Sequence, residues 1–264
     1  MNDILKECYV RDVTKNLMSK EFSVNMILRT KSDLASEILK LLFTPENIRL
    51  NSDASLEFLA DIDGENITLY NKNGKVIDEN KYWGITVHLL KKYFNLDKLI
   101  LPLSVSTVVE KLSIDFGFYI IYGGISKNEL IAEAEENGLY IQKRLLSDPI
   151  FYAVSLLDYL NYNGISFKSL ISSVPDAYTS IGRINDLSFN ETEILNVLSD
   201  KTGHLSFKNG IKIFNNNGWI LIFPENTCNA ITIITESQSF EAAEELCFDT
   251  LEKIKTCKSQ KNSV

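Results

Sequence analysis

Three acidic side chains near residue 63 are the first in the sequence whose spacing could support chemistry. The segment DIDGEN places Asp61, Asp63 and Glu65 at alternate positions. Alternate residues of an extended segment point to the same side, so the three carboxylates can converge on one hard cation such as Mg²⁺. The alternative is an acidic strand end and turn that face water. The residues leave both interpretations open, and magnesium is the only cofactor they suggest.

A second candidate is the loop between two apolar runs near the C-terminus. WILIF at 219–223 is fully apolar, AITII at 230–234 is rich in β-branched residues, and PENT supplies turn chemistry after the first run. A loop in this setting often presents backbone N–H groups to an anion. Phe223 before the proline and Glu225 after it contribute no positive charge, which raises the question of whether the loop binds phosphate at all.

Histidines and cysteines indicate no further site. The four cysteines are far apart and have no CxxC spacing, which argues against a zinc or redox site. His88 lies in a helix-like stretch, where a histidine is more often a helix-face residue than a base. His204 stands beside a turn, with no nucleophile near it in the sequence. A serine-type catalytic triad therefore receives no support.

Charge and hydropathy exclude several classes of partner. The net charge of −8 argues against nucleic acid or an anionic membrane, because both need a basic protein face. No apolar run approaches the ~20 residues that span a bilayer, and the charged N-terminal residues do not resemble a secretory signal. We therefore expect a cytoplasmic protein with neither nucleic acid nor membrane as a partner.

Strand and helix patterns alternate through the first two thirds of the chain and indicate an α/β layer with a largely parallel sheet. A helix at 32–43 with Ser32 or Asp33 as N-cap and a helix at 126–137 that ends at Gly138 are typical members. Residues 177–188 have the pattern of a linker. Strands are predicted at 23–30, on both sides of 61–66, at 98–103 and at 118–123, and further helices at 80–94, 106–116, 148–163 and 166–176.

The last part of the chain predicts a small α+β domain. Asn190 is a helix N-cap with Glu193 as its capping-box partner, and Phe189 is placed to pack on Ile194. Strands are expected at 203–207, 210–214, 219–223 and 230–234, followed by a helix at 239–256. The apolar stripe of that helix consists of Phe240, Ala243, Cys247, Leu251 and Ile254.

Four stretches of the sequence carry a family resemblance: YVRDV, GENITLYNKNGKVIDENKYWGITVHLL, LILPLSVSTVVEKLSIDFGFYIIYG and NGIKIFNNNGWILIFPENT. With them the chain resembles the C-terminal half of the α-D-phosphohexomutases, phosphoglucomutase and phosphomannomutase. It looks closest to the mutase-like region of bacterial mannose-1-phosphate guanylyltransferase-like proteins. The resemblance implies an α/β fold of phosphohexomutase type with mixed sheets, followed by a small α+β domain.

The resemblance also implies a domain division and the location of the catalytic residue. It suggests a truncated second-domain remnant at 1–77, a third domain at 78–177 and a C-terminal domain at 186–264. The family's catalytic phosphoserine belongs to a first domain, and this sequence contains no Ser-His-Asn stretch. We therefore expect no catalytic residue here, because phosphoryl transfer between sugar positions would lack its covalent relay.

Two site motifs of the family have altered counterparts in the first 140 residues. The family's metal loop has three aspartates followed by an arginine, which correspond here to Asp61, Asp63 and Glu65 with Asn66 in the arginine's place. The family's sugar-recognition loop is similar to Glu-x-Ser-Gly-His. Its candidate counterpart is the stretch from Glu135 through Asn137 and Gly138 to Leu139, which equally fits the end of a helix. An arginine of a second recognition segment corresponds to Ile121.

The family's phosphate loop is similar to Arg-Pro-Ser-Gly-Thr-Glu-Pro, with a second arginine shortly after it. Its counterparts here are Phe223, Pro224, Glu225, Asn226 and Thr227, and the second arginine corresponds to Thr232. Both cationic forks that would hold a phosphate are therefore replaced. Glu225 adds a like charge that repels a dianion.

These motifs favour a non-catalytic phosphohexomutase-like module with a scaffold or regulatory role, linked to sugar-phosphate or sugar-nucleotide metabolism. One alternative is a diverged, Mg²⁺-dependent phosphoglucomutase or phosphomannomutase that acts only with missing N-terminal domains. Another is a module that binds a neutral or cationic ligand in an acidic cleft. The partners to consider are a weakly bound sugar phosphate, a protein, or the missing domains.

Overall fold

The computed structural model describes residues 3–185, 190–198, 203–207, 210–215, 218–225 and 229–261. The chain divides into two compact units. Unit 1 comprises Met1–Leu101 and Val108–Pro175, and unit 2 comprises Pro102–Thr107 and Asp176–Val264. The chain therefore passes between the units after residues 101, 107 and 175. The three-part division at 1–77, 78–177 and 186–264 stays a prediction.

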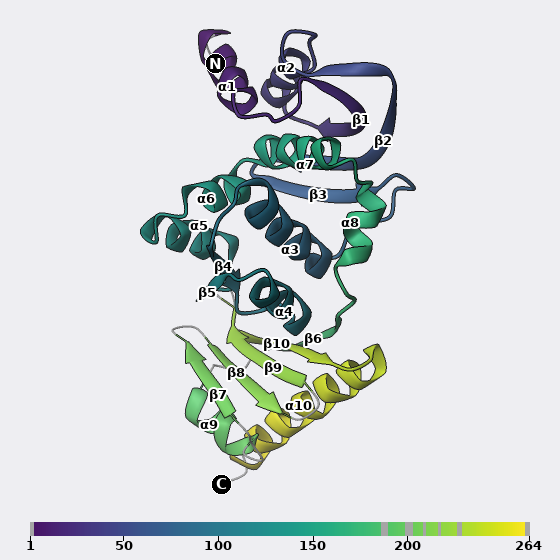
Figure 1. The fold of residues 1–264 in the computed structure, drawn as a ribbon. Helices are drawn as coiled ribbons and strands as arrows, with labels where there is room; N and C mark the ends of the chain where they lie inside the picture. Colours follow the sequence, from purple (N-terminus) through teal and green to yellow (C-terminus); the bar gives the residue numbers. More distant parts are fainter. Residues whose placement is uncertain are drawn as a thin grey trace. The chain divides into compact units, whose positions relative to one another are not determined.

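Unit 1 contains the alternating helices and strands that the sequence predicts, together with two helices that were not predicted (Figure 1). Its N-terminal elements are α1 (Asp3–Thr14), β1 (Glu21–Thr30), α2 (Asp33–Leu42), β2 (Arg49–Asp63), β3 (Asn66–Asn71), α3 (Glu79–His88) and the π-helical turn η1 (Leu89–Tyr93). The remaining elements are β4 (Lys98–Pro102), α4 (Thr107–Asp115), β5 (Tyr119–Gly123), α5 (Lys127–Glu136), α6 (Tyr140–Ser147), α7 (Pro149–Asn163) and α8 (Phe167–Ser173). The two helices that were not predicted are α1 and α6.

The three-stranded sheet of unit 1 has the order β1-β2-β3 and is mixed. β1 pairs with β2 in parallel, and β2 pairs with β3 in antiparallel orientation. The expectation of a largely parallel sheet is wrong here, because the short turn at Gly64 and Glu65 can only return the chain antiparallel. Gly64 adopts φ +59°, a conformation that favours glycine. β4 and β5 form a separate two-stranded sheet.

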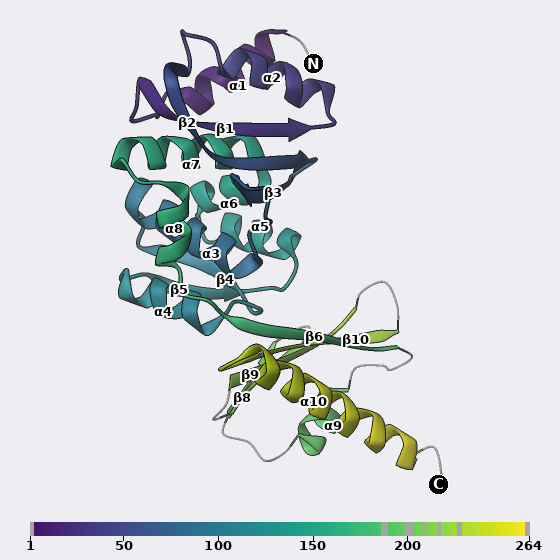
Figure 2. The same ribbon diagram turned by 90° about the vertical axis from the view of Figure 1, so that its right-hand side faces the viewer.

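Helix α7 is the central helix of unit 1. Its residues from Pro149 to Leu160 are all buried, as expected for a helix with few polar side chains on any side. Asp148 caps its N-terminus by accepting from the Phe151 amide, and Gly164 ends it with φ +61°. Figure 2 shows α2 on one side of β1 and α7 on the other, so the sheet is covered on both faces.

A buried carboxylate in α7 fixes the chain before β1. Asp158 is fully buried and accepts hydrogen bonds from the Met18 amide at 2.6 Å and the Ser19 amide at 3.0 Å. The Tyr93 hydroxyl donates to the same carboxylate at 2.6 Å. A buried charge is tolerated only when donors of this kind surround it. Asp158 therefore serves packing, and its three donors leave it poorly placed to act as a base.

Unit 2 contains a five-stranded sheet with the order β6-β10-β9-β8-β7, in which each strand pairs with its neighbours in antiparallel orientation. Figure 1 shows α10 lying across one face of this sheet. The elements are β6 (Tyr178–Asn185), α9 (Glu191–Val197), β7 (Gly203–Phe207), β8 (Gly210–Asn215), β9 (Gly218–Pro224), β10 (Ala230–Ser237) and α10 (Phe240–Lys261).

Strand β6 corrects a sequence-based prediction. Residues 177–188 have the composition of a linker, but residues 178–185 form an edge strand paired with β10 along its whole length. Small residues explain why the strand pattern is weak. A Cβ atom at Gly182 would lie 2.8 Å from Cys247 Sγ and 2.8 Å from Leu251 Cδ1, so α10 packs where a side chain would be.

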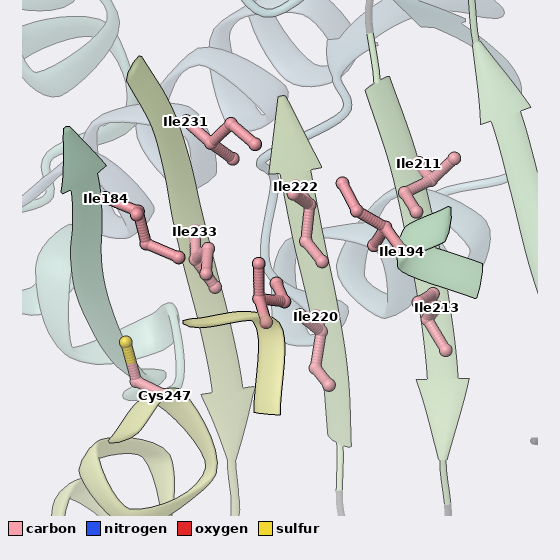
Figure 3. Close-up of a cluster of buried hydrophobic side chains, with 10 residues drawn as sticks. Ile184, Ile194, Ile211, Ile213, Ile220, Ile222, Ile231, Ile233 and Cys247 are labelled. Atoms are coloured by element: carbon pink, nitrogen blue, oxygen red, sulfur yellow. The ribbon is translucent and has the colours of Figure 1, made fainter. Parts of the chain in front are cut away.

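The core of unit 2 confirms the predicted strands and most of the predicted helix stripe. Isoleucines from β6, β8, β9 and β10 gather with α9 and α10 on one sheet face (Figure 3). Ala243, Cys247 and Ile254 of α10 are buried there, and Leu251 packs against the cluster. Phe240 was wrongly placed in this stripe, since it is 52% exposed. The predicted contact of Phe189 lies outside the described residues.

Candidate functional site

The turn between β2 and β3 contains the predicted metal ligands. Asp61 lies on β2, opposite Arg29 of β1 and Thr68 of β3. The Arg29 Nη1 atom lies 3.9 Å from Asp61 Oδ1, and that oxygen is buried without a hydrogen bond. A hydrogen bond to Asp61 is the main cause that raises the pKa of Tyr70. Asp61 therefore has weak partners, and its Oδ1 atom is an acceptor that receives no hydrogen bond.

The other two carboxylates of this turn do not complete a metal site. Asp63 and Glu65 are both exposed. Among the described residues, no group of three or more His, Cys, Asp or Glu side chains could hold a metal ion. The sequence-based prediction places three converging carboxylates around the ion. The described residues do not bring the three carboxylates together, and magnesium at Asp61, Asp63 and Glu65 stays a prediction.

A lysine of the chain approaches the same turn. Lys127, the first residue of α5, donates from Nζ to the Glu65 carbonyl, and its distance to Asn66 Oδ1 is 3.2 Å. Burial lowers the pKa of Lys127, while the Glu65 carboxylate acts in the opposite direction. The positive charge at the tip of the turn is thus the ammonium group of a lysine in the same chain, Lys127. Sequence reasoning missed Lys127, because nothing local links it to a turn 61 residues earlier.

The predicted sugar-recognition residues lie at the end of a helix. Ser126 and Glu129 form a capping box at the start of α5, Asn137 is its C-cap, and Gly138 follows with φ +71°. This confirms the helical interpretation of residues 126–137. The Glu135 carboxylate pairs with Lys143 at 2.7 Å, and Asn137 Nδ2 donates to the Glu133 carbonyl at 2.8 Å. Sugar binding by Glu135, Asn137 and Gly138 stays a prediction.

The predicted phosphate loop joins β9 to β10. Phe223 lies opposite Thr232, Pro224 lies opposite Ile231, and the Glu225 amide donates to the Ala230 carbonyl at 2.9 Å. The strand-loop-strand prediction is therefore confirmed up to Glu225. Asn226 and Thr227, the remaining predicted residues, lie outside the described residues.

The Glu225 side chain turns back onto the sheet and is held by an arginine. Arg183 Nε lies 2.7 Å from Glu225 Oε1, and Arg183 Nη2 lies 2.9 Å from Glu225 Oε2. Thr232 Oγ1 donates to Glu225 Oε1 at 2.8 Å. This is a bidentate guanidinium–carboxylate pair with one added donor. Arg183 was missed because it lies in the segment predicted to be a linker; recognising β6 would have placed it opposite Thr232.

His88 is the one histidine whose side chain the structure describes, and its surroundings do not form a catalytic pair. Burial, with a smaller contribution from Lys92, lowers the pKa of His88 to about 4. Its Nε2 atom lies 3.2 Å from Ser173 Oγ, which donates to the Leu170 carbonyl at 2.7 Å. The Nδ1 atom is buried without a hydrogen bond. A serine whose proton is donated to a carbonyl, beside a histidine whose Nδ1 atom has no hydrogen bond, is not an activated nucleophile.

Within the part of the chain that the structure describes, no helix is long and apolar enough to cross a membrane.

The two units together define a mixed α/β fold that matches phosphohexomutase domains. One solved structure with this fold is a phosphoglucomutase/phosphomannomutase family protein from Burkholderia thailandensis, with a TM-score of 0.74 and 13% identity over 96% of this chain and 65% of that one. Another is the N-acetylphosphoglucosamine mutase of Aspergillus fumigatus in complex with GlcNAc-6P and magnesium, with a TM-score of 0.67 and 11% identity over 96% of this chain and 66% of that one.

One curated protein adds sequence similarity to the shared fold. The phosphoglucosamine mutase of Methanococcus maripaludis is 23% identical over 213 residues, which cover 74% of this chain and 47% of that protein. No family model matches the sequence. The chain thus spans about half the length of the curated relative and about two thirds of each solved chain. These findings support the resemblance to the phosphoglucomutase/phosphomannomutase family.

Proposed function

We propose that this chain is a non-catalytic phosphohexomutase-like module with a scaffold or regulatory role in sugar-phosphate or sugar-nucleotide metabolism. The link to that metabolism rests on the sugar-phosphate mutases that share its fold and part of its sequence. Its closer kinship to mannose-1-phosphate guanylyltransferase-like proteins and its cytoplasmic location are parts of the same proposal. The proposed partners are another protein or further domains.

The observation that carries the proposal is the Arg183–Glu225 pair. A phosphate at the β9–β10 loop would need positive donors, and the guanidinium that lies there already binds the chain's own carboxylate at 2.7 and 2.9 Å. Because Arg183 is 51% exposed, the whole ion pair contributes only about 1 kcal/mol. A phosphate would have to break that pair and then face the released glutamate. Two unit charges ~4 Å apart repel by about 4 kcal/mol at an effective dielectric of 20.

The second candidate is a diverged, Mg²⁺-dependent phosphoglucomutase or phosphomannomutase that needs further domains. The buried Asp61 Oδ1 atom without a hydrogen bond favours it, because a metal ion could use that oxygen. A third candidate, a module that binds a neutral or cationic ligand in an acidic cleft, has less support at the β9–β10 loop. There the charge of Glu225 is compensated by Arg183.

Thermal unfolding tests the proposal directly. The purified chain is melted with glucose 1-phosphate, mannose 1-phosphate, glucosamine 1-phosphate or glucose 1,6-bisphosphate, each with and without Mg²⁺. A ligand at 100 times its Kd stabilises a protein by about 2.7 kcal/mol, which raises Tm visibly. We expect no change in Tm with any of them. A sugar phosphate that raises Tm only with Mg²⁺ would refute the proposal and support the diverged mutase.

A further inference from the structure

Residues 102–107 connect β4 to α4 but fold with unit 2, and we call them the strap. Leu103, Val105 and Ser106 are 4%, 2% and 0% exposed. The Val105 amide donates to the Pro102 carbonyl at 2.9 Å, which closes a turn within the strap. The loop after a strand at its carboxyl end is where open α/β sheets commonly bind ligands. Here that loop is buried against protein instead.

A buried lysine holds the middle of the strap. Lys212 of β8 is 2% exposed, and its Nζ atom donates to the Leu103 carbonyl at 3.0 Å and to the Val105 carbonyl at 3.3 Å. The same Nζ atom lies 4.1 Å from the centre of the Trp219 ring. Burying an ammonium group is costly unless carbonyls and an aromatic face replace its water. Lys212 therefore makes a specific set of bonds to the strap.

A buried glutamate holds the end of the strap. Glu236 of β10 is 7% exposed, and its two carboxylate oxygens lie 3.0 and 3.3 Å from the amide nitrogen of Thr107. Thr107 is the first residue of α4, whose first N–H groups have no partner within the helix. A carboxylate at this end also interacts favourably with the helix dipole. Glu236 thus supplies the acceptor that the start of α4 requires.

The strand register places both charged groups on one face of the sheet. Lys212 lies opposite Leu221, while Glu236 lies opposite Trp219, two positions earlier in β9. Residues two apart in a strand point to the same side. This face is opposite to the isoleucine cluster, to which Ile211 and Ile213 belong. The strap therefore meets a cation and an anion presented by the same rigid surface.

We propose that Lys212 and Glu236 form a two-point clamp that fastens the strap to the sheet of unit 2. The lysine ammonium donates to two carbonyl oxygens of the strap, and the glutamate carboxylate accepts from a backbone amide. Thr107, the last residue of the strap, is also the first residue of α4, so the clamp fixes the residue at which that helix begins. The clamp is a conformational device of the chain, independent of whether any ligand binds.

Native-state hydrogen exchange of the intact protein at rising, sub-denaturing urea concentrations tests the clamp without any substitution. Amides open with the cooperative unit to which they belong. We expect the exchange rates of the Val105 and Thr107 amides to rise with urea concentration in the same way as those of the β9 amides in unit 2. If they follow the amides of β4 and of the later turns of α4 instead, the clamp does not exist.

Substitutions identify the groups responsible. E236Q preserves size and K212M preserves the length of the side chain, while each removes one charge. We expect exchange at the strap to accelerate at least about tenfold in each variant, with the β9 amides slowed or accelerated by less than about twofold. K212R should restore slow exchange, and K253M, at an exposed position of α10, should have no effect. Unchanged exchange at the strap, or equal acceleration throughout unit 2, would overturn the proposal.

Discussion

The β2–β3 turn of unit 1 and the β9–β10 turn of unit 2 both carry acidic residues where the family resemblance implies a charged ligand. In unit 2, Glu225 is held by two guanidinium contacts of 2.7 and 2.9 Å and by a threonine hydroxyl. In unit 1, Asp61 has an arginine at 3.9 Å, and one of its oxygens is buried without a hydrogen bond. The β9–β10 turn is thus a closed turn, in which the acidic side chain is fully paired with residues of the chain itself. The β2–β3 turn is a loosely held turn, in which Asp61 has only a distant cation.

The difference shows that a loop's chemistry depends on the strands beside it. Glu225 taken alone is an added negative charge, but Arg183, 42 residues earlier in the chain, turns it into half of a bidentate pair. The cationic groups at the turn in unit 1 belong to Arg29 and Lys127, and neither makes a bidentate ion pair with a carboxylate of that turn. We therefore expect the two turns to differ in the energy of their ion pairs and in their response to ligands.

The largest expected effect is a pH dependence of the stability of unit 1. It identifies which unfolding transition belongs to which unit, and the turns of the two units can be compared only when this is known. His88 in unit 1 has a pKa lowered to about 4, mainly by burial, against about 6.5 in an unfolded chain. Its stabilising contribution is complete above pH 6.5 and is lost as the pH falls toward 4. The loss in the free energy of unfolding of unit 1 should reach about 3 kcal/mol at pH 4. Urea unfolding at several pH values measures it.

H88Q is the control for that measurement, because carboxylates also titrate in this range. The variant should lack the part of the pH dependence between pH 6.5 and 4 that belongs to His88. The transition that differs between wild type and H88Q is then the unfolding of unit 1. Identical pH profiles would show that the pKa of His88 is the same in the folded and the unfolded protein, contrary to the expected lowering.

The next largest effect concerns the ion pairs of the two turns. R183L should lower the free energy of unfolding of unit 2 by about 1–2 kcal/mol, because it leaves Glu225, 24% exposed, with its guanidinium partner removed. R29L should change the stability of unit 1 by less than about 0.5 kcal/mol, since its contact with Asp61 is long and exposed. Urea unfolding of both variants gives the comparison.

Double-mutant cycles isolate the two pairs from other effects of each substitution. We expect a coupling energy near 1 kcal/mol between R183L and E225Q, and a coupling close to zero between R29L and D61N. Equal coupling energies in the two cycles would contradict the contrast between a closed and a loosely held turn.

A smaller effect should appear in ligand binding at the β9–β10 turn. E225Q removes the negative charge and keeps an oxygen that accepts from Thr232, so repulsion of a phosphate decreases. We expect calorimetry to detect glucose 1-phosphate binding by E225Q at ligand concentrations where the wild type gives no signal, a gain in affinity of at least about tenfold, or about 1.4 kcal/mol. E244Q, which makes the same charge change at an exposed position of α10, should bind as the wild type does. Equal affinities for both variants would mean that Glu225 does not exclude phosphate.

Local patterns were sufficient for most of the elements in this fold. The helix at 126–137 and its glycine end, the strands around residue 225, and the apolar face of α10 all follow from signals within a few residues. The parallel expectation for the first sheet failed because alternation of elements does not determine which strands pair. β6 was missed because α10 packs so close that Gly182 and other small residues replace the usual strand pattern.

The candidate sites were less predictable, because their decisive partners are distant in sequence. The resemblance identified the turns, but Arg183 and Lys127 reach them from other strands and helices. The clamp on residues 102–107 has the same origin, since Lys212 and Glu236 lie more than a hundred residues from the backbone they bind. The pairing register of β6, β8, β9 and β10 is what places Arg183, Lys212 and Glu236.

The smallest expected effect tests whether the turn in unit 1 retains a metal function. Asp61 has an oxygen without a hydrogen bond, but Asp63 and Glu65 are exposed and Lys127 lies at the tip of the turn. Because the carboxylates do not converge, we expect millimolar Mg²⁺ to leave the Tm of unit 1 unchanged in the wild type and in D61N. K127M removes the competing ammonium and is the most sensitive background for the same melt. A rise in Tm with Mg²⁺ that D61N abolishes would confirm the magnesium prediction, and it would make the loosely held turn the working half of a diverged enzyme.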